Sequence, residues 1–432
     1  MNFWLNLPPN ARYAILALAG MVLGAAVNFA ACALAYERRP RSPWMRLDVA
    51  GRAEHGWLDC LPIVGWLRLR RERDLFGAWF WLRALVVEAG LAAALPVMYW
   101  WEVAERGLWM ALPNMFPGVV PPSVVPETNL VLAAHAMFAA HAALLAAMAA
   151  ASLIDIDEKL IPDGVTVPIT LFGLVSAAVY PWSRLPAGLA QDPVAGPVLD
   201  FIKVTSPMRQ AWPDVLGERP HASGLAIGIA CFVLWVVALL PRPWRTGRGL
   251  RVAMRLLCVR FKQGLLTWQA IGLLVAGIAG VAWSWQQGGP QWIGLSSALV
   301  GMLAGGGMVW IVRVLGSVML GREAMGFGDV TLMAMIGTFV GWQACLLAFF
   351  LAPLFALLFG VVQLAIRKDN EIYYGPFLCL ATAVVAVRWR DVWGWAWPMF
   401  DLGWLVPAAM GLALVVMIFL LAIMRSIRNR LS

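Results

Sequence analysis

The sequence predicts an all-α, polytopic helical membrane protein with about 9–11 transmembrane helices. Of its 432 residues, 61% are hydrophobic and only 13% are charged. The apolar residues come in continuous runs of about 20 or more, the length that a helix needs to cross a bilayer. Soluble domains are only about half apolar, and the strands of a membrane barrel alternate in short segments. Both of those classes are therefore excluded.

About eleven apolar segments follow one another along the chain. They lie at residues 13–36, 79–101, 129–154, 163–182, 223–241, 265–285, 293–319, 330–342, 343–366, 376–388 and 402–424. Most have the length of a membrane-spanning helix, whereas 330–342 is short for a relaxed span of about 20 residues. The expected number of spans therefore depends mainly on whether 330–342 crosses the membrane by itself.

The orientation follows from the basic residues, which are concentrated in residues 37–78, 242–262 and 425–430. By the positive-inside rule these three regions are cytoplasmic. With eleven spans the N-terminus then lies outside. The ends of the apolar segments that carry Asp155 and Asp329 both face the cytoplasm. The net charge of +9 reflects this loop pattern, so no nucleic-acid partner is expected.

We expect five regions along the chain. Residues 1–36 hold the first transmembrane helix, 37–78 a cytoplasmic domain and 79–182 further spans with a first acidic cluster. Residues 183–290 are an insertion, and residues 291–432 hold the remaining spans with a second acidic cluster.

The insertion has two polar parts. Residues 183–222 are polar and rich in proline, which predicts a long external loop. Residues 242–264 form a basic linker whose pattern is compatible with an amphipathic helix on an anionic leaflet. Two extra spans lie within and beside these parts.

Acidic residues lie at the ends of two apolar runs that are far apart in the chain. One cluster is Asp155, Asp157, Glu158 and Asp163, and the other centres on Asp329. A carboxylate near the hydrocarbon zone costs several kcal/mol unless it is paired or hydrated, so such acids are functional candidates. The alternative is a structural ion pair together with ordinary loop acids. Asp163 has a structural explanation, because Pro162 is a helix-start signal and an acid suits the first helical turn.

Gly326 and Gly328 precede Asp329 in the sequence GFGD. Glycine permits unusual backbone angles and the close approach of another main chain, so an extended peptide has room beside Asp329. The alternative is a tight turn that caps the following helix.

A pair of carboxyl groups that approach each other shares one proton near neutral pH. If Asp155 and Asp329 converge, one acts as general base on a water and the other as general acid, without metal or covalent intermediate. Competing sites are poor, because the four histidines form no HExxH spacing and no GxSxG or P-loop is present. His135 and His141 lie in one apolar segment, and we interpret them as helix-packing residues.

Several motifs together resemble the type IV prepilin leader peptidase family of inner-membrane GxGD aspartic peptidases. The block from Gly321 to Ala344 resembles the family's most diagnostic motif, and LIDID followed by LIPD at 153–163 resembles the other. Residues 374–377 (YGPF) resemble a late Gly-Pro motif. Gly24, Asn28, the stretch 59–67 and Glu88 resemble the family's N-terminal region.

This resemblance implies a catalytic pair of Asp155 and Asp329 in a multi-pass protein of the inner (plasma) membrane. It implies cleavage of leaders from prepilins or pseudopilins at the cytoplasmic face, with N-methylation by S-adenosylmethionine in many members. The residues implied to bind substrate or support the site are Gly326, Gly328, Asp157, Asp163, Gly375 and Pro376. The acidic turn at Asp157 and Glu158 is a candidate attractor for the basic residues of a leader.

The chain also departs from the family pattern. Members usually carry two CxxC pairs in the first cytoplasmic domain, whereas residues 39–44 and 71–77 here hold no cysteine. We therefore predict no metal, and methylation is an open question. Thr331 stands where a lysine is common, and Tyr373 with Tyr374 replaces a Pro-Phe pair.

Two other functions remain as alternatives. An ion-coupled transporter would use Asp155 and Asp329 as relay groups, but it needs acids near the bilayer midplane rather than at one face. A catalytically inactive scaffold for pilus or secretion assembly would keep the motifs without the activity.

Overall fold

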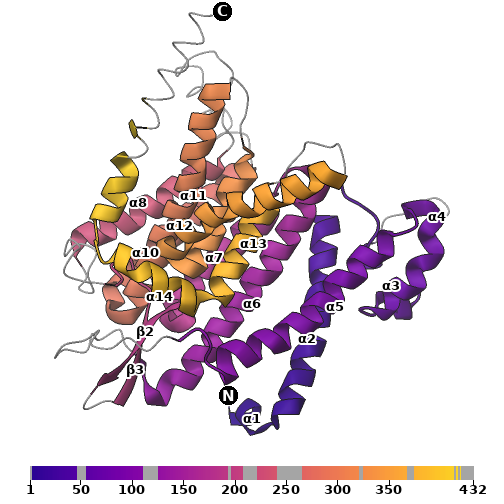
Figure 1. Ribbon diagram of the computed structural model, residues 1–432, viewed down its shortest axis with the longest axis horizontal. Coiled ribbons are helices and arrows are strands. Elements are labelled where there is room, and N and C mark those ends of the chain that lie inside the picture. The colour runs from indigo at the N-terminus through magenta and orange to yellow at the C-terminus, as the bar shows by residue number, and fades with distance from the viewer. Residues whose placement is uncertain are drawn as a thin grey trace, which may run out of the picture.

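The computed structural model confirms the predicted fold class of a helical, multi-pass membrane protein (Figure 1). It describes residues 2–45, 55–109, 125–192, 196–207, 221–240, 265–320, 325–366 and 374–412, with 415, 416 and 419. Within these residues, seven helices are long and apolar enough to cross a membrane, and two shorter helices are also apolar.

The main helices follow the apolar segments of the sequence closely. They are α2 (Pro9–Ala33), α5 (Phe80–Tyr99), α6 (Glu127–Glu158), α7 (Asp163–Val179), α8 (Ala222–Leu239), α10 (Leu265–Gln287), α11 (Gly289–Leu320), α12 (Phe327–Ile366) and α13 (Tyr374–Val387). Shorter helices are α1 (Asn2–Asn6), α3 (Val64–Leu69), α4 (Arg73–Phe76) and α14 (Trp389–Phe400). Figure 1 shows α2 and α5 crossing beside α6, with the later helices gathered on the other side of α6.

Helix α12 is two helices that fold back at Gly341. The backbone of Gly341 is non-helical, with a φ of 78°, which favours glycine. A Cβ placed on Gly305 of α11 would lie 2.5 Å from Met333 O and 3.2 Å from Cys345 Sγ. On a straight helix those twelve residues would span about 18 Å, so the two halves must run in opposite directions. The separate segments 330–342 and 343–366 expected from the sequence are therefore present.

A small sheet covers one end of the helices, in the region where the sequence analysis expects a loop at 183–222. Strands β1 (Val125–Pro126), β2 (Pro186–Asp192) and β3 (Gly196–Phe201) are antiparallel in the order β1-β3-β2. The indole N–H groups of Trp389 and Trp393 donate to the carbonyls of Pro186 and Ala187 at 2.7 and 2.9 Å. These hydrogen bonds from tryptophans about 200 residues away hold β2 in place. No local sequence pattern around residues 183–222 predicts the strands. The linker expected at 242–264 lies outside the described residues.

The polar segment after α2 is built around a buried aspartate. Asp59 accepts hydrogen bonds from the Gly56 amide, Arg68 Nε and Arg71 Nη2 at 2.9, 2.9 and 2.7 Å. Burial by itself would raise the pKa of Asp59, but these hydrogen bonds outweigh it and lower the pKa. This ion cluster holds α3 between residues 39–44 and 71–77, the two stretches where the resemblance leads us to expect cysteine pairs.

The residues named for their resemblance near the N-terminus form one buried network. The Glu88 carboxylate accepts hydrogen bonds from Trp66 Nε1 at 2.7 Å and Asn28 Nδ2 at 3.2 Å, and also from the Ile63 amide. Gly24 allows α2 to approach the backbone of Glu88, since a Cβ there would lie 2.6 Å from Glu88 Cα. The network joins α2, α3 and α5. It therefore attaches Ile63 and Trp66, at the start of α3, to the membrane helices.

Candidate active site

The two aspartates of the predicted pair come from opposite ends of two helices. Asp155 lies in the last turn of α6, and Asp329 lies in the first turn of α12. Both are buried, with exposed fractions of 6% and 7%. Their carboxyl groups lie close enough for a direct Coulomb interaction, although 174 positions separate them in the chain.

Backbone amides hold each carboxylate in place. The amide of Gly375, at the start of α13, donates to Asp155, and the amide of Gly326 donates to Asp329. A Cβ on Gly375 would lie only 2.6 Å from Asp155 Oδ2, so this helix end lies directly against the carboxylate. The first-turn location of Gly375 in α13 also places the positive end of a helix dipole beside Asp155.

Gly328 brings the two acidic motifs into contact. A Cβ on Gly328 would lie 2.8 Å from Ile161 Cβ, 2.9 Å from Ile161 N and 3.0 Å from Ile161 O. A Cβ on Gly375 would lie 3.0 Å from the Cδ1 of the same isoleucine. The loop of the first motif is thus packed against the second motif and the late Gly-Pro motif, so three distant stretches meet at one place.

Two residues that the sequence analysis did not single out belong to this environment. Arg313 of α11 is buried, and its Nε donates to Met325 O at 2.8 Å, which braces the turn before Asp329. Cys379 is buried one turn along α13, close to both aspartates. An arginine inside an apolar run is itself a functional signal, so Arg313 was available to sequence analysis. Nothing in the sequence marks Cys379.

Asp157 and Glu158 join α6 to the segment after α2. Asp157 forms ion pairs with Arg39 at 2.7 Å and with Arg83 at 2.6 Å. Glu158 accepts hydrogen bonds from the backbone amides of Tyr36 and Glu37 at 2.9 and 3.1 Å. These contacts engage both carboxylates within the protein, which favours a supporting role over attraction of a leader's basic residues.

The remaining predicted residues lie at helix starts around the pair. Asp163 is the first residue of α7, directly after Pro162 at the N-cap, and its side chain is exposed. Pro376 follows Gly375 in the first turn of α13. Thr331, at a position where the resemblance leads us to expect a lysine, donates from Oγ1 to Gly328 O at 3.0 Å within the first turn of α12.

Both histidines of α6 make polar contacts with the neighbouring helix. The partly buried His135 contacts the Tyr99 hydroxyl at 3.0 Å, and His141 lies 3.0 Å from Glu102 with both of these side chains buried. They face α5 and its continuation rather than Asp155. Within the described part of the chain, no group of three or more His, Cys, Asp or Glu side chains is arranged to hold a metal ion.

Residues 261–361 match the model of the type IV leader peptidase family. A prepilin leader peptidase/N-methyltransferase of Pseudomonas putida is 35% identical over 103 residues, which are 23% of this chain and 35% of that protein. The protein of the same name from Pseudomonas aeruginosa is 36% identical over 100 residues, 22% of this chain and 34% of its own. The one from Neisseria gonorrhoeae is 27% identical over 99 residues, 23% of this chain and 34% of its own.

The chain therefore spans about a third of the length of the curated relatives that it matches. The match confirms the resemblance over the segment that carries Gly326, Gly328 and Asp329. Asp155 and Gly375 lie outside it. No solved structure matches the chain.

Proposed function

We propose that this protein is an intramembrane aspartic endopeptidase that cleaves the leaders of prepilin-like or pseudopilin-like substrates. The observation that carries the proposal is that the chain turns beside Asp155 and Asp329 pack together: Gly328 approaches Ile161, and Gly375 approaches both Ile161 and Asp155. Both aspartates are buried there. The match of residues 261–361 to the type IV leader peptidase family supplies the reaction class and the substrate class.

The chain's own residues account for the steps of hydrolysis. Two buried carboxyl groups at close range favour the state that shares one proton. The ionised carboxylate takes a proton from a water as that water attacks the scissile carbonyl carbon, and the protonated one donates to the carbonyl oxygen. The carboxyl group that took the water's proton then gives it to the departing amine as the C–N bond breaks. A hydroxyl of the tetrahedral intermediate returns its proton to the other carboxylate, so the pair again holds one proton.

The position of the pair suits a substrate with an apolar helix. Asp155 and Asp329 lie at the ends of apolar helices, so a substrate helix in the bilayer would bring its polar flank to their level. We assign this level to the cytoplasmic face, with the N-terminus outside, because residues 37–78 and 425–430 carry most of the basic residues outside the insertion. The multi-pass location in the inner membrane follows from the helices and the family match.

The cavity beside Asp157 is too small to hold the cofactor of methyl transfer. The cavity beside Asp157 has a volume of about 40 Å³. One water needs about 10–15 Å³ on this scale, so the cavity holds about three waters. S-Adenosylmethionine, with a nucleoside and an amino acid, does not fit there.

The test uses purified full-length protein in lipid and a pilin-like peptide with its leader. Asp155→Asn and Asp329→Asn keep the shape of each side chain but remove the shared proton, so each should abolish cleavage. Asp74→Asn is the matched control, since the Asp74 side chain is 90% exposed. All three proteins should keep the wild-type melting temperature within a few degrees.

The outcome separates the proposal from the two alternatives. A scaffold would show no cleavage in the wild-type protein under any lipid condition. A relay transporter would show no cleavage but would carry protons or ions in liposomes, and the two Asn variants would stop that flux. Full cleavage by either Asn variant would contradict the assignment of the pair.

A further inference from the structure

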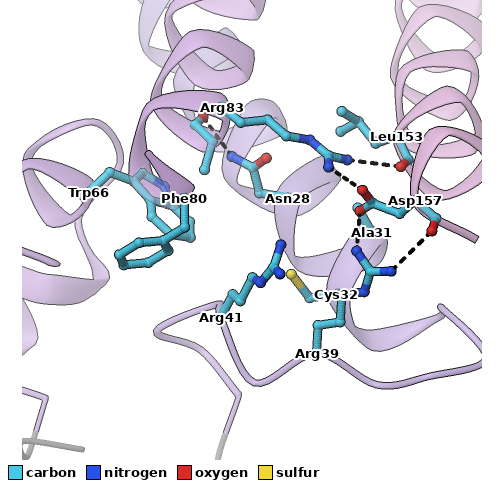
Figure 2. A pocket seen from close by; sticks show the side chains of 11 residues that line it. Asn28, Ala31, Cys32, Arg39, Arg41, Trp66, Phe80, Arg83, Leu153 and Asp157 are labelled. Carbon is cyan, nitrogen blue, oxygen red and sulfur yellow. Dashed lines mark hydrogen bonds and ion pairs between the residues drawn. The ribbon is translucent and has the colours of Figure 1, made fainter. Parts of the chain in front are cut away.

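A cavity with three arginines in its wall lies on the face of α6 away from Asp155, between the ends of α2, α5 and α6. Figure 2 shows side chains from all three helices and from the segment after α2 pointing into it. Leu153 and Asp157 of α6 line it, whereas Asp155 between them faces the other way. The cavity is therefore separate from the site where hydrolysis is proposed.

The cavity is basic. Arg39, Arg41 and Arg83 line it together with one acid, Asp157, which leaves a net charge of +2. Asp157 binds Arg39 and Arg83 and holds both guanidinium groups at the wall. Arg41 forms no ion pair or side-chain hydrogen bond with any described residue, and Figure 2 shows its guanidinium beside Cys32.

The donors in the cavity exceed its acceptors. Each guanidinium carries five N–H donors. Arg39 uses its Nη groups on the carboxylate and carbonyl of Asp157, and Arg83 uses its Nη groups on Asp157 and on Leu153 O at 2.8 Å. Among the residues that the structure describes, the remaining N–H groups, including those of the Arg41 side chain, have no protein acceptor, so they can bind an anion.

The size of the cavity selects the anion. Its volume of about 40 Å³ accepts a group about the size of three waters. A phosphate group has this size, carries one or two negative charges, and matches the fork of donors that arginine presents. A nucleotide or a folded peptide does not enter.

The surroundings indicate where such a phosphate would come from. Trp57 and Trp79 are 74% and 72% exposed, and Trp44 is 42% exposed, all in the segments that flank the cavity. Exposed tryptophans mark the interface between a bilayer and water. Basic pockets between helices at this level bind the head groups of anionic lipids.

We propose that this cavity, lined by Arg39, Arg41 and Arg83, binds a phosphate group at the membrane interface. The phosphodiester of an anionic phospholipid and free inorganic phosphate share this chemistry. Arg41 binds the phosphate oxygens directly, and Asp157 sets the positions of the other two arginines.

The experiment measures retention of phosphatidylglycerol and phosphatidylcholine by the purified full chain, using native mass spectrometry after stepwise delipidation. Inorganic phosphate is titrated separately in detergent. Arg41→Gln should weaken phosphate or phosphatidylglycerol binding about tenfold, the effect of losing a charge-assisted hydrogen bond. Arg38→Gln is the control, because Arg38 is exposed in the same segment and does not line the cavity.

The proposal is supported, with a lipid as the source of the phosphate group, if the protein prefers phosphatidylglycerol to phosphatidylcholine and only Arg41→Gln removes that preference. Arg38→Gln should keep it. Binding of inorganic phosphate with the same dependence, but without lipid preference, supports it with free phosphate as source. Equal losses in both variants, or no loss in either, would overturn it. If Arg41→Gln does not fold, Arg41→Lys keeps the charge and should bind with intermediate affinity, because lysine lacks the fork.

A second measurement reports on the cavity itself. Cys32 lines the cavity and Cys60 lies outside it. The labelling rate of Cys32 therefore reports on the cavity, and the labelling rate of Cys60 is an internal control. A small methanethiosulfonate reagent should label Cys32 several times more slowly when phosphatidylglycerol or phosphate is bound, with Cys60 unaffected. An unchanged ratio of the two labelling rates under saturating ligand would contradict binding in this cavity.

Discussion

The two glycines of the GFGD motif should respond very differently to alanine. A Cβ on Gly328 would lie 2.8, 2.9 and 3.0 Å from three atoms of Ile161, two of them backbone atoms. A Cβ on Gly326 would meet nothing closer than Asp329 Oδ2 at 3.6 Å, and the backbone of Gly326 is not in the left-handed region. The motif's letters alone would treat both positions as equivalent.

The cost of Gly328→Ala can be estimated from this geometry. Carbon atoms pack best at about 3.5–4.0 Å, so Ile161 and the start of α12 must separate by about 0.5–1 Å. Overpacking of this kind costs about 1–3 kcal/mol. The same shift moves Asp329 relative to Asp155, and a misplacement of about 1 Å costs about a hundredfold in rate.

The assay compares wild type, Gly328→Ala and Gly326→Ala in one lipid preparation. We expect Gly328→Ala to lose about a hundredfold in kcat and to melt at a lower temperature. We expect Gly326→Ala to stay within about threefold of wild type, since its Cβ makes ordinary van der Waals contact. Ile161→Ala should not rescue Gly328→Ala, because alanine keeps the Cβ, N and O atoms that the new Cβ would meet.

Wild-type activity in Gly328→Ala would refute the packing argument, because the close approach would then be unimportant. Equal losses in both alanine variants would also refute it, since Gly326 would then act through something other than contact with Ile161. Failure of both variants to change melting temperature, with activity lost in both, would point to direct contact with substrate instead.

Three further predictions follow from buried polar groups. Asp157→Asn should destabilise the protein by about 1–2 kcal/mol, a figure reduced for the partial exposure of Arg39 and Arg83, while cleavage falls by less than tenfold; a calorimetric scan and a rate assay check both. Asp59 has a lowered pKa, so the stability it gives is present above the ordinary value of 3.8 and is lost as the pH falls through the lowered pKa; hydrogen exchange in residues 55–76 should rise there in wild type but show no such step in Asp59→Asn. His141→Ala should cost about 1–3 kcal/mol by leaving the buried Glu102 without this hydrogen-bond partner, and the added change Glu102→Leu should recover part of that loss, as a double-mutant cycle in chemical denaturation would show.

The membrane architecture was largely predictable because spans follow from length and hydropathy. The helices coincide with the apolar segments, and even the short segment 330–342 exists as one half of α12. Hydropathy alone does not show that this half is enclosed by α11 and the second half of α12, because enclosure depends on contacts far along the chain.

The acidic motifs predicted the candidate pair, since buried carboxylates are costly enough to stand out in an apolar sequence. Their partners were much less predictable. The assignment of Asp157 to Arg39 and Arg83 depends on where α2 and α5 meet α6, and the nearby Lys159 was the only local candidate. The β-strands at 186–201 were missed because tryptophans from α14 provide the partners for their carbonyls.

Because α12 folds back at Gly341, the position of Asp329 along the membrane normal does not depend on the surrounding lipid. Every residue from 329 to 346 is buried within the protein, so this arm of the hairpin meets no acyl chains. A spanning helix normally tilts or shifts when bilayer thickness changes. The height of Asp329 is instead set by its protein neighbours, and an enzyme built in this way would work alike in thin and thick membranes.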